Sequence, residues 1–151
     1  MQKLSVIGST DKIDFPTFDL SNIRCKIDTG ALSSSIHCSE KEVVERNGTK
    51  VLRFKVLDED HPQFQENWLE TIDFDQRDVK SSNGQVEPRY FIRANVLVLG
   101  QIIEAEFSLA DRSTMSFPVL LGKSFLYKNF IVDVSLDNVS YKNKKLNKKL
   151  K

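Results

Sequence analysis

The sequence predicts a mostly β protein, a small closed β-barrel with one short helix, and three observations lead to this fold class. Stretches such as Arg24 to Asp28 alternate polar and apolar residues with a period of two. Turn-forming pairs separate such stretches at Asn47-Gly48, Asn83-Gly84 and Gly100-Gln101. Only Ser124 to Lys128 has a convincing helical pattern. Several short hairpins with one brief helix are typical of a barrel, because closing the sheet removes its exposed edges.

The first third of the chain is predicted to contain three strands. Leu4 to Gly8 and Lys12 to Phe15 are short strands, and Pro16 places the second at an edge or an end, because proline cannot donate to a strand ladder. Arg24 to Asp28 is the third. Its alternation points Cys25 inward, together with Ile27, and places the charged residues on the other face.

Three hairpins are predicted in the middle of the chain. Asn-Gly pairs favour the two-residue turns whose twist matches that of the flanking strands. Charges, a proline and the absence of periodicity indicate a loop over residues 58–67. The predicted strand pairs are 43–45 with 50–56, 69–79 with 86–92, and 94–99 with 102–109.

After the helix, residues 130–134 and 139–141 are predicted as terminal strands, so residues 1–141 form one domain. The tail from Lys142 to Lys151 contains six lysines and is predicted to be disordered. A solvated tail is the simpler interpretation of these charges, and a surface for RNA or an acidic protein is the alternative.

Composition excludes several classes of protein. A net charge of +1 and a hydrophobic content of 40% indicate neither a disordered chain nor a strongly basic nucleic-acid binder. The first residues lack the apolar core of a signal peptide, and no run reaches the roughly 18 apolar residues of a membrane span. We therefore expect a soluble, cytoplasmic protein with no membrane or nucleic-acid partner, in which Cys25 and Cys38 are reduced.

The function is predicted by Asp28-Thr29-Gly30-Ala31, which closes the third strand. An Asp-Thr-Gly turn at the end of a strand is how an aspartic peptidase presents its catalytic carboxylate, here Asp28. The Thr29 hydroxyl can bond to neighbouring backbone, and Gly30 permits a close approach that a Cβ would forbid. A second motif, Val119 to Gly122, precedes the predicted helix.

With these two motifs the chain resembles the retropepsin-like aspartic peptidases. It is most similar to the bacterial branch labelled ATP-dependent zinc protease, which is often linked to ATP-grasp glutamate ligases. The resemblance runs from about Leu4 to Asp133, implies the retropepsin barrel, and includes Lys26, His37, residues 77–84, Glu87, Arg89 and residues 111–113. It also implies that the second motif packs beneath the Asp28 turn.

Peptide hydrolysis by this family uses two carboxylates that share one proton. The sequence has a single Asp-Thr-Gly, so we expect a twofold homodimer whose dyad is Asp28 from each chain. A mobile hairpin usually covers such a dyad. The hairpin tipped by residues 81–84 falls where that flap is expected, the alternative being an ordinary surface turn.

Cations near the motifs predict an acidic, glutamate-rich peptide substrate. Lys26 shares the face of Asp28, Arg93 lies on the second predicted flap strand, and Lys123 follows the second motif. The alternative is that these cations form surface pairs with Glu87, Asp73, Asp75, Asp78 and Glu104. The predicted substrate-binding residues are Lys26, Ala31, Arg77, Lys80, Ser82, Asn83, Gly84, Arg89 and Arg112.

Two further alternatives concern metal and catalysis. The chain has two histidines, His37 and His61, and lacks His-Glu-x-x-His, so no zinc and no other cofactor are predicted. His37 is expected to orient the Asp28 loop or to pack as a hydrogen-bonded core residue. Because Lys26 favours an ionised Asp28, a non-catalytic peptide-binding or assembly module on the same fold stays open.

Overall fold

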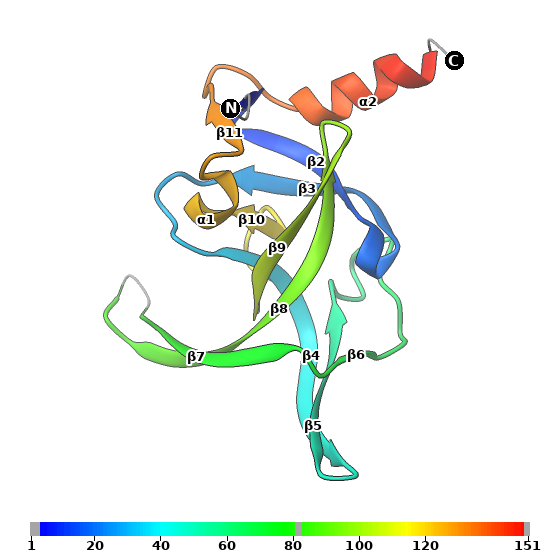
Figure 1. Cartoon of the computed structure of the whole chain (residues 1–151), viewed down its shortest axis with the longest axis vertical. Helices are drawn as coiled ribbons and strands as arrows, with labels where there is room; N and C mark the ends of the chain where they lie inside the picture. Colours follow the sequence, from blue (N-terminus) through cyan, green and yellow to red (C-terminus); the bar gives the residue numbers. More distant parts are fainter. Residues whose placement is uncertain (1–3, 81–82, 150–151) are drawn as a thin grey trace.

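The computed structural model describes residues 4–80 and 83–149, and these residues are mostly β-strand (Figure 1). The mostly β prediction is confirmed. In chain order the elements are β1 (Ser5–Ile7), β2 (Thr10–Phe15), the 3-10 helix η1 (Pro16–Phe18), β3 (Leu20–Ile27), β4 (Ser34–Arg46), β5 (Thr49–Val56), β6 (Leu69–Thr71), β7 (Phe74–Lys80), β8 (Val86–Val98), β9 (Gln101–Ala110), β10 (Val119–Leu121), α1 (Lys123–Leu126), β11 (Phe130–Val132) and α2 (Val139–Lys149).

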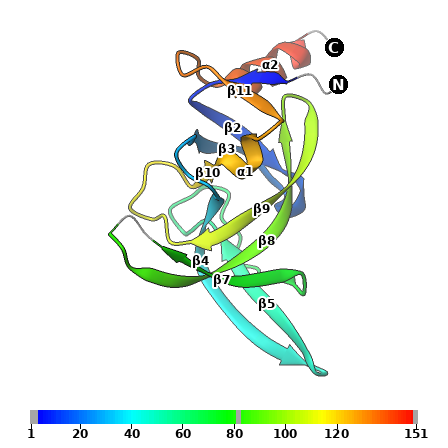
Figure 2. The ribbon, with the colours of Figure 1, turned by 60° about the vertical axis from the view of Figure 1, so that its left-hand side comes forward.

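Nine strands form one sheet in the order β10-β3-β2-β8-β9-β4-β5-β6, and β7 pairs with β8 outside this path. β10 also pairs with β4, so the path of hydrogen bonds from β10 through β3, β2, β8, β9 and β4 returns to β10. β1 and β11 form a separate parallel pair (Figure 2). The β4–β5 hairpin extends away from the rest of the sheet in both views.

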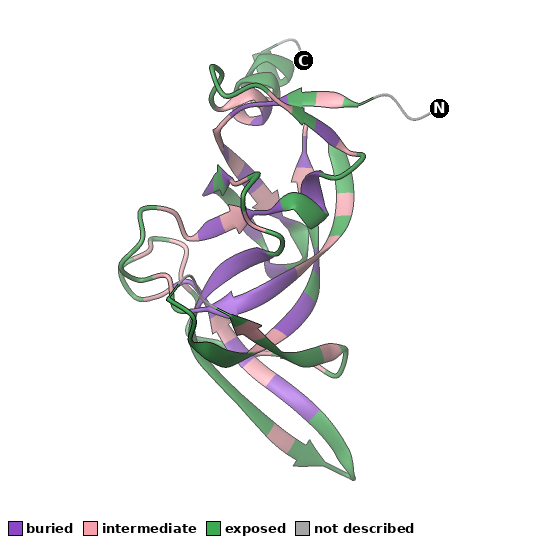
Figure 3. Cartoon of the chain, turned by 90° about the vertical axis from the view of Figure 1, so that its left-hand side faces the viewer, coloured by how far each residue is buried: buried purple, intermediate pink, exposed green. Residues whose placement is uncertain are grey.

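The core fills the inside of the curved sheet, where buried residues alternate with exposed ones along the strands (Figure 3). In β3, Ile23, Cys25 and Ile27 are buried while Arg24 and Lys26 are exposed, as the period of two predicts. Phe15 and Phe107 are fully buried, and their ring centroids lie 5.5 Å apart at the centre of the core. The burial of Ile23, Cys25 and Ile27 in this core leaves Arg24 and Lys26 on the outward face of β3.

The hairpin prediction is confirmed for β4–β5 and, from Phe74 onward, for β7–β8, and the third turn is shifted by one residue. Residues 69–71 of the predicted flap strand instead form β6, which pairs with β5. Leu99 and Gly100 occupy the two central positions of the third turn with φ of 50° and 74°, and Val98 pairs with Gln101. The two-residue turns that match strand twist need positive φ at both centres, so Leu99 accepts a strained backbone. β4 is far longer than predicted, and β8 continues through Arg93 as a single strand.

The prediction for the C-terminus is wrong, because residues 139–149 form helix α2 instead of a strand followed by a disordered tail. The buried carboxylate of Asp11 accepts hydrogen bonds from the backbone N–H groups of Ser140 and Tyr141, at 2.9 and 3.1 Å. Lys144 bonds to both carboxylate oxygens of Asp14. These partners lie about 130 positions earlier in the chain, where local sequence reading cannot find them. Residues 150–151 of the predicted tail lie outside the described residues.

Within the described ranges, no helix has the length and apolarity to cross a membrane. Cys25 and Cys38 are both buried and carry free thiols, as expected. Burial raises the pKa of both thiols above the ordinary cysteine value.

Candidate active site

Asp28 follows the last residue of β3 and is half-buried at the start of a tight turn. Its backbone N–H donates to the Leu121 carbonyl at 2.9 Å, which ties the turn to β10. The Gly30 N–H donates to Asp28 Oδ1 at 2.9 Å. In the described part of the chain, Oδ2 has no hydrogen-bond partner. The turn therefore fixes the carboxylate through one oxygen and leaves the other available.

The second motif packs beneath this turn, as the resemblance implies. An added Cβ at Gly122 would lie 2.4 Å from the Ser33 carbonyl oxygen and 2.9 Å from that of Ala31. No side chain fits there, which explains the glycine. The Gly122 N–H donates to Ser34 Oγ, and the Lys123 N–H donates to the Ala31 carbonyl at 2.7 Å. The backbone of the motif thus holds the loop that follows Asp28.

Arg112 is the most firmly held cation near the turn. Nε donates to the Phe117 carbonyl at 2.9 Å and Nη1 to Ser35 Oγ at 3.2 Å. Partial burial lowers the pKa of Arg112, the positive charge of Arg89 lowers it further, and the charge of Asp28 acts in the opposite direction. Arg89 and Asp28 therefore both lie within electrostatic range of Arg112.

His37 holds the backbone of Arg112. Nδ1 of this buried ring accepts the Arg112 N–H at 2.9 Å, so the ring proton resides on Nε2. Nε2 lies 2.7 Å from Asp58 Oδ2 and donates to it. His37 is thus a hydrogen-bonded buried residue, one of the two roles expected for it. Sequence analysis missed Asp58, which lies in a loop with no recognisable pattern.

The predicted flap is the β7–β8 hairpin, whose strands pair from Phe74 with Ile92 to Lys80 with Val86. Gly84 has a φ of +85°, and the Asn83 side chain accepts the Gln85 N–H at 3.0 Å. Lys80 is exposed at the end of β7. Ser82, also predicted to bind substrate, lies outside the described residues.

Three arginines on and beside this hairpin form ion pairs with carboxylates. In addition to its ion pair, the Arg77 guanidinium lies 3.7 Å from the centroid of the Phe91 ring. The exposed fractions of the three side chains are 48%, 26% and 59%, so each pair is open to solvent. The pairs are Arg77 with Glu106, Arg89 with Glu87, and Arg93 with Glu104.

The structure therefore divides the predicted substrate-binding residues into two groups. Lys26 and Ala31 lie on β3 and in the Asp28 turn, and Arg112 lies near them. Arg77, Lys80, Asn83, Gly84 and Arg89 belong to the β7–β8 hairpin. Of this second group, Arg89 is the residue whose charge acts on Arg112.

Potential metal ligands do not gather in the described ranges, where no cluster of three or more His, Cys, Asp or Glu side chains could hold an ion. His61 bonds through Nδ1 to the Gln63 N–H, and burial lowers the pKa of its ring. His37, Asp58, His61 and Arg112 line a pocket of about 150 Å³.

Comparison with curated proteins finds relatives named probable alpha-L-glutamate ligase. The protein from Shewanella halifaxensis (strain HAW-EB4) is 31% identical over 134 residues, covering 86% of this chain and 28% of that protein. The protein from Desulfotalea psychrophila (strain LSv54 / DSM 12343) is 29% identical over 135 residues, covering 87% and 28%. The chain thus spans about 28% of the length of these relatives.

A solved structure and a protein family also match. A protein of unknown function from Legionella pneumophila subsp. pneumophila str. Philadelphia 1 has the same fold, with a TM-score of 0.72, 23% identity, and coverage of 91% of this chain and 99% of that one. Residues 6–143 match the family RimB-like, described as retropepsin-like aspartic endopeptidase RimB. The chain therefore belongs to the RimB-like family of retropepsin-like aspartic endopeptidases.

Proposed function

We propose that the protein is a cytoplasmic, homodimeric aspartic-type peptidase whose dyad consists of Asp28 from each chain. The observation that carries this proposal is the support of the Asp28 turn. The Gly30 N–H bonds to one oxygen of Asp28, and Gly122, having no side chain, lets its strand pack directly against the backbone of the loop that follows Asp28. Each chain contributes one such carboxylate. A twofold axis through the turn places it opposite its own copy.

The chemistry needs one ionised and one protonated carboxylate. The ionised Asp28 takes a proton from a water molecule, whose oxygen attacks the peptide carbonyl carbon, while the protonated Asp28 donates to the carbonyl oxygen. Collapse of the tetrahedral intermediate breaks the C–N bond: the Asp28 that took the water proton passes it to the leaving nitrogen, and the other Asp28 regains a proton from a hydroxyl of the intermediate. The β7–β8 hairpin is the proposed lid that excludes bulk water from this step.

Exposed apolar side chains support the dimer. Among the described residues, β1 and β11 pair only with each other. Val6 and Ile131 are 43% and 52% exposed on this pair, and Leu32 is 71% exposed beside the Asp28 turn. A second copy would cover such side chains. The closed barrel also belongs to this proposal, supported by the pairing of β10 with both β3 and β4.

The proposed substrate is an acidic, glutamate-rich peptide. Lys26 shares the outward face of β3 with Asp28, and Arg112 lies within electrostatic range of it. The relatives named as glutamate ligases are consistent with a substrate made by adding glutamate. We therefore propose a functional link to an ATP-grasp glutamate ligase.

A non-catalytic peptide-binding or assembly module is the second candidate, and the names of the curated relatives favour it. The chain matches 28% of those proteins, so the similar segment could hold a peptide for ligation elsewhere in the protein. In this alternative the Asp28 turn binds peptide without hydrolysing it.

Peptide hydrolysis separates the two candidates. The full chain is incubated with acidic, neutral and basic peptides, and products are followed by mass spectrometry, with Asp28→Asn as the control. The peptidase is supported by cleavage that Asp28→Asn abolishes while peptide binding persists. Binding without cleavage by either protein, at concentrations where the wild type is dimeric, would remove the peptidase and leave the binding module.

A further inference from the structure

The outward face that carries Asp28 continues from β3 onto β2. Antiparallel pairing places Lys26 opposite Thr10, and Arg24 opposite Lys12. Directly opposed residues project from the same face with Cβ atoms about 5 Å apart. The register thus places Arg24 and Lys12 side by side on one face, where the Arg24 guanidinium lies 4.7 Å from the centroid of the Phe117 ring and Lys12 extends toward α2.

Helix α2 extends this positive surface. In the described residues, the ladder between β2 and β8 consists of one pair, Asp14 with Leu97. Helix α2 joins the two strands further along: the Ser140 N–H donates to Asp11 on β2, and the Ser140 hydroxyl accepts the N–H of Leu99 in the β8–β9 turn. The Lys12 ammonium lies 4.4 Å from the centroid of the Tyr141 ring, and the Lys145 ammonium lies 4.8 Å from it. The hydrogen bond and charge of Lys145, with the charges of Lys12 and Lys144, lower the pKa of the Tyr141 hydroxyl.

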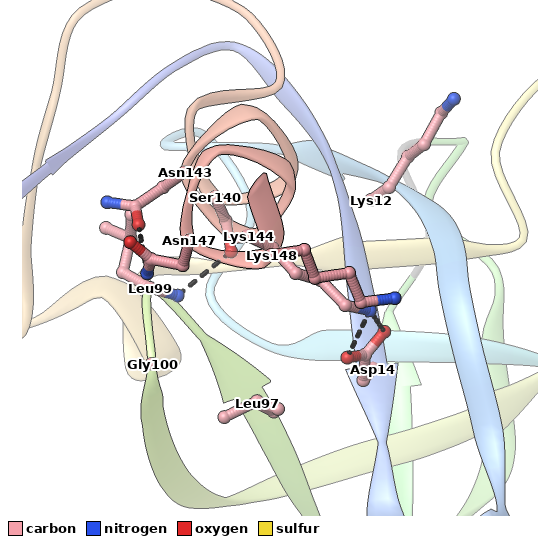
Figure 4. Close-up of a pocket in the computed structure, with 10 residues that line it drawn as sticks. All are labelled: Lys12, Asp14, Leu97, Leu99, Gly100, Ser140, Asn143, Lys144, Asn147 and Lys148. Atoms are coloured by element: carbon pink, nitrogen blue, oxygen red, sulfur yellow. Dashed lines mark hydrogen bonds and ion pairs between the residues drawn. The ribbon is translucent and has the colours of Figure 1, made fainter. Parts of the chain in front are cut away.

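A pocket of about 200 Å³ opens beside these cations, between α2, β2 and the β8–β9 turn (Figure 4). Lys144 points at Asp14 on one side, while Asn143 and Asn147 lie together on the opposite side. Lys12 and Lys148 also line the pocket. Ammonium and amide N–H groups are the donors that carboxylates accept from.

Most of these cations lack a carboxylate partner. Within the described ranges, only two lysines of α2 form ion pairs, Lys144 with Asp14 and Lys142 with Asp137. The remaining members of the surface have none, so their charge is available to a ligand. They are Arg24, Lys26, Lys12, Lys145, Lys148 and Lys149.

From this continuity we propose that the cations from Lys26 through Arg24 and Lys12 to the α2 lysines form an exosite that holds an extended acidic segment of the substrate. This exosite, named here the β3–α2 track, rests on the proposed function, because it leads away from the Asp28 turn. It binds the part of the acidic chain that is not being cleaved, and it thereby favours long substrates over short ones.

The track sets a minimum substrate length. Asp28 lies four positions after Arg24 on an extended strand, a span of roughly 13 Å at about 3.3 Å per residue. An extended peptide therefore needs about four residues beyond the scissile bond to reach Arg24 and Lys12, and more to reach α2. Peptides of three residues cannot span from the dyad to the helix.

Fluorescence anisotropy on the Asp28→Asn protein tests the track without requiring turnover. The probes are labelled decaglutamate, triglutamate and a ten-nucleotide single-stranded RNA. The test variant is Lys145→Gln/Lys148→Gln, and the charge-matched control is Lys41→Gln/Lys50→Gln on the β4–β5 hairpin. We expect the Kd for decaglutamate to rise about fivefold in the test variant at low salt, to stay within error in the control, and to be unchanged for triglutamate in both.

Circular dichroism verifies that α2 still folds in the test variant, and Lys148→Arg should retain decaglutamate affinity if charge alone matters. Equal decaglutamate affinity in the test variant and the control would overturn the track. RNA that binds more tightly than decaglutamate, and loses affinity with the α2 lysines, would replace it with a nucleic-acid site. Loss of decaglutamate affinity in the test variant, together with no peptide cleavage by the wild-type protein, would remove the peptidase while retaining the track.

Discussion

Two groups of cations in the molecule differ in what surrounds their charges. On the β7–β8 hairpin and the adjoining β8 strand, Arg77, Arg89 and Arg93 each contact a carboxylate. Along the β3–α2 track, Lys26 and Arg24 have no such partner in the part of the chain that the structure describes. The arrangement of the strands produces the difference, because β9 brings Glu104 and Glu106 beside β8, which itself carries Glu87, whereas β2 presents Lys12 to β3.

The comparison shows that counting cations near a motif overestimates the field at a site. An arginine in an ion pair contributes a dipole, while an unpaired lysine contributes a full charge that attracts anions over about 8 Å at physiological salt. The surface-pair alternative from the sequence thus describes Arg89 and Arg93, and the acidic-substrate prediction rests on β3, β2 and α2.

The largest expected effect comes from disrupting the close packing of Gly122 beneath the Asp28 turn, at the end of β3. Gly122→Ala forces a Cβ against two backbone carbonyls, so we expect the free energy of unfolding to fall by about 3 kcal/mol, measured by urea denaturation. Gly84→Ala on the hairpin is the matched control. It meets no atom within 4 Å and strains only the backbone, for a loss of about 1 kcal/mol. Equal losses would show that Gly122 is not a close-contact position.

Charge reversal on the unpaired side should have the next largest effect. Lys26→Glu is expected to lower kcat/KM for an acidic peptide about 20-fold, because it places a negative charge on the face of Asp28. The kcat/KM of Lys26→Gln should fall between those of the wild type and Lys26→Glu. For a neutral peptide, kcat/KM should change far less. Steady-state kinetics at low and high salt measure this, and a loss that is the same for neutral and acidic peptides would assign Lys26 to the chemistry instead of to substrate charge.

Removing a carboxylate partner from the β7–β8 hairpin should leave an unpaired cation there, as on the β3–α2 track. Glu106→Gln frees Arg77 from its ion pair, so we expect decaglutamate to bind the Asp28→Asn protein about twofold more tightly. The gain should vanish above about 0.5 M salt, since screening removes exposed interactions. Tighter binding that persists at high salt would point to a change in the hairpin rather than in its charge.

The smallest effect is expected where the charge is already neutralised. Arg93→Gln removes a side chain that is 59% exposed and paired with Glu104, so acidic-peptide affinity should change less than about twofold. The free energy of unfolding should stay within about 0.5 kcal/mol of the wild type. A loss of affinity comparable to that of Lys26→Gln would contradict the division between paired and unpaired regions.

Much of the fold followed from local pattern. The alternation in β3 predicted which side chains point outward, and Asn47-Gly48 predicted its turn, where both residues have positive φ. Single-turn features such as these depend on a few adjacent residues. The position of the third turn was missed, because Leu99 adopts a conformation that its own side chain disfavours and that the two flanking strands impose.

The sequence by itself determined the Asp28 turn and the outward face of β3, because short-range geometry and side-chain alternation depend on consecutive residues, while the family resemblance implied the glycine beneath the turn. Only the tertiary structure decided which cations are neutralised and where the C-terminus goes. Asp11 caps α2 from about 130 positions earlier in the chain. Asp58 bonds to His37, which in turn accepts the backbone N–H of Arg112. Such contacts depend on how strands align in space, and no local pattern records that alignment.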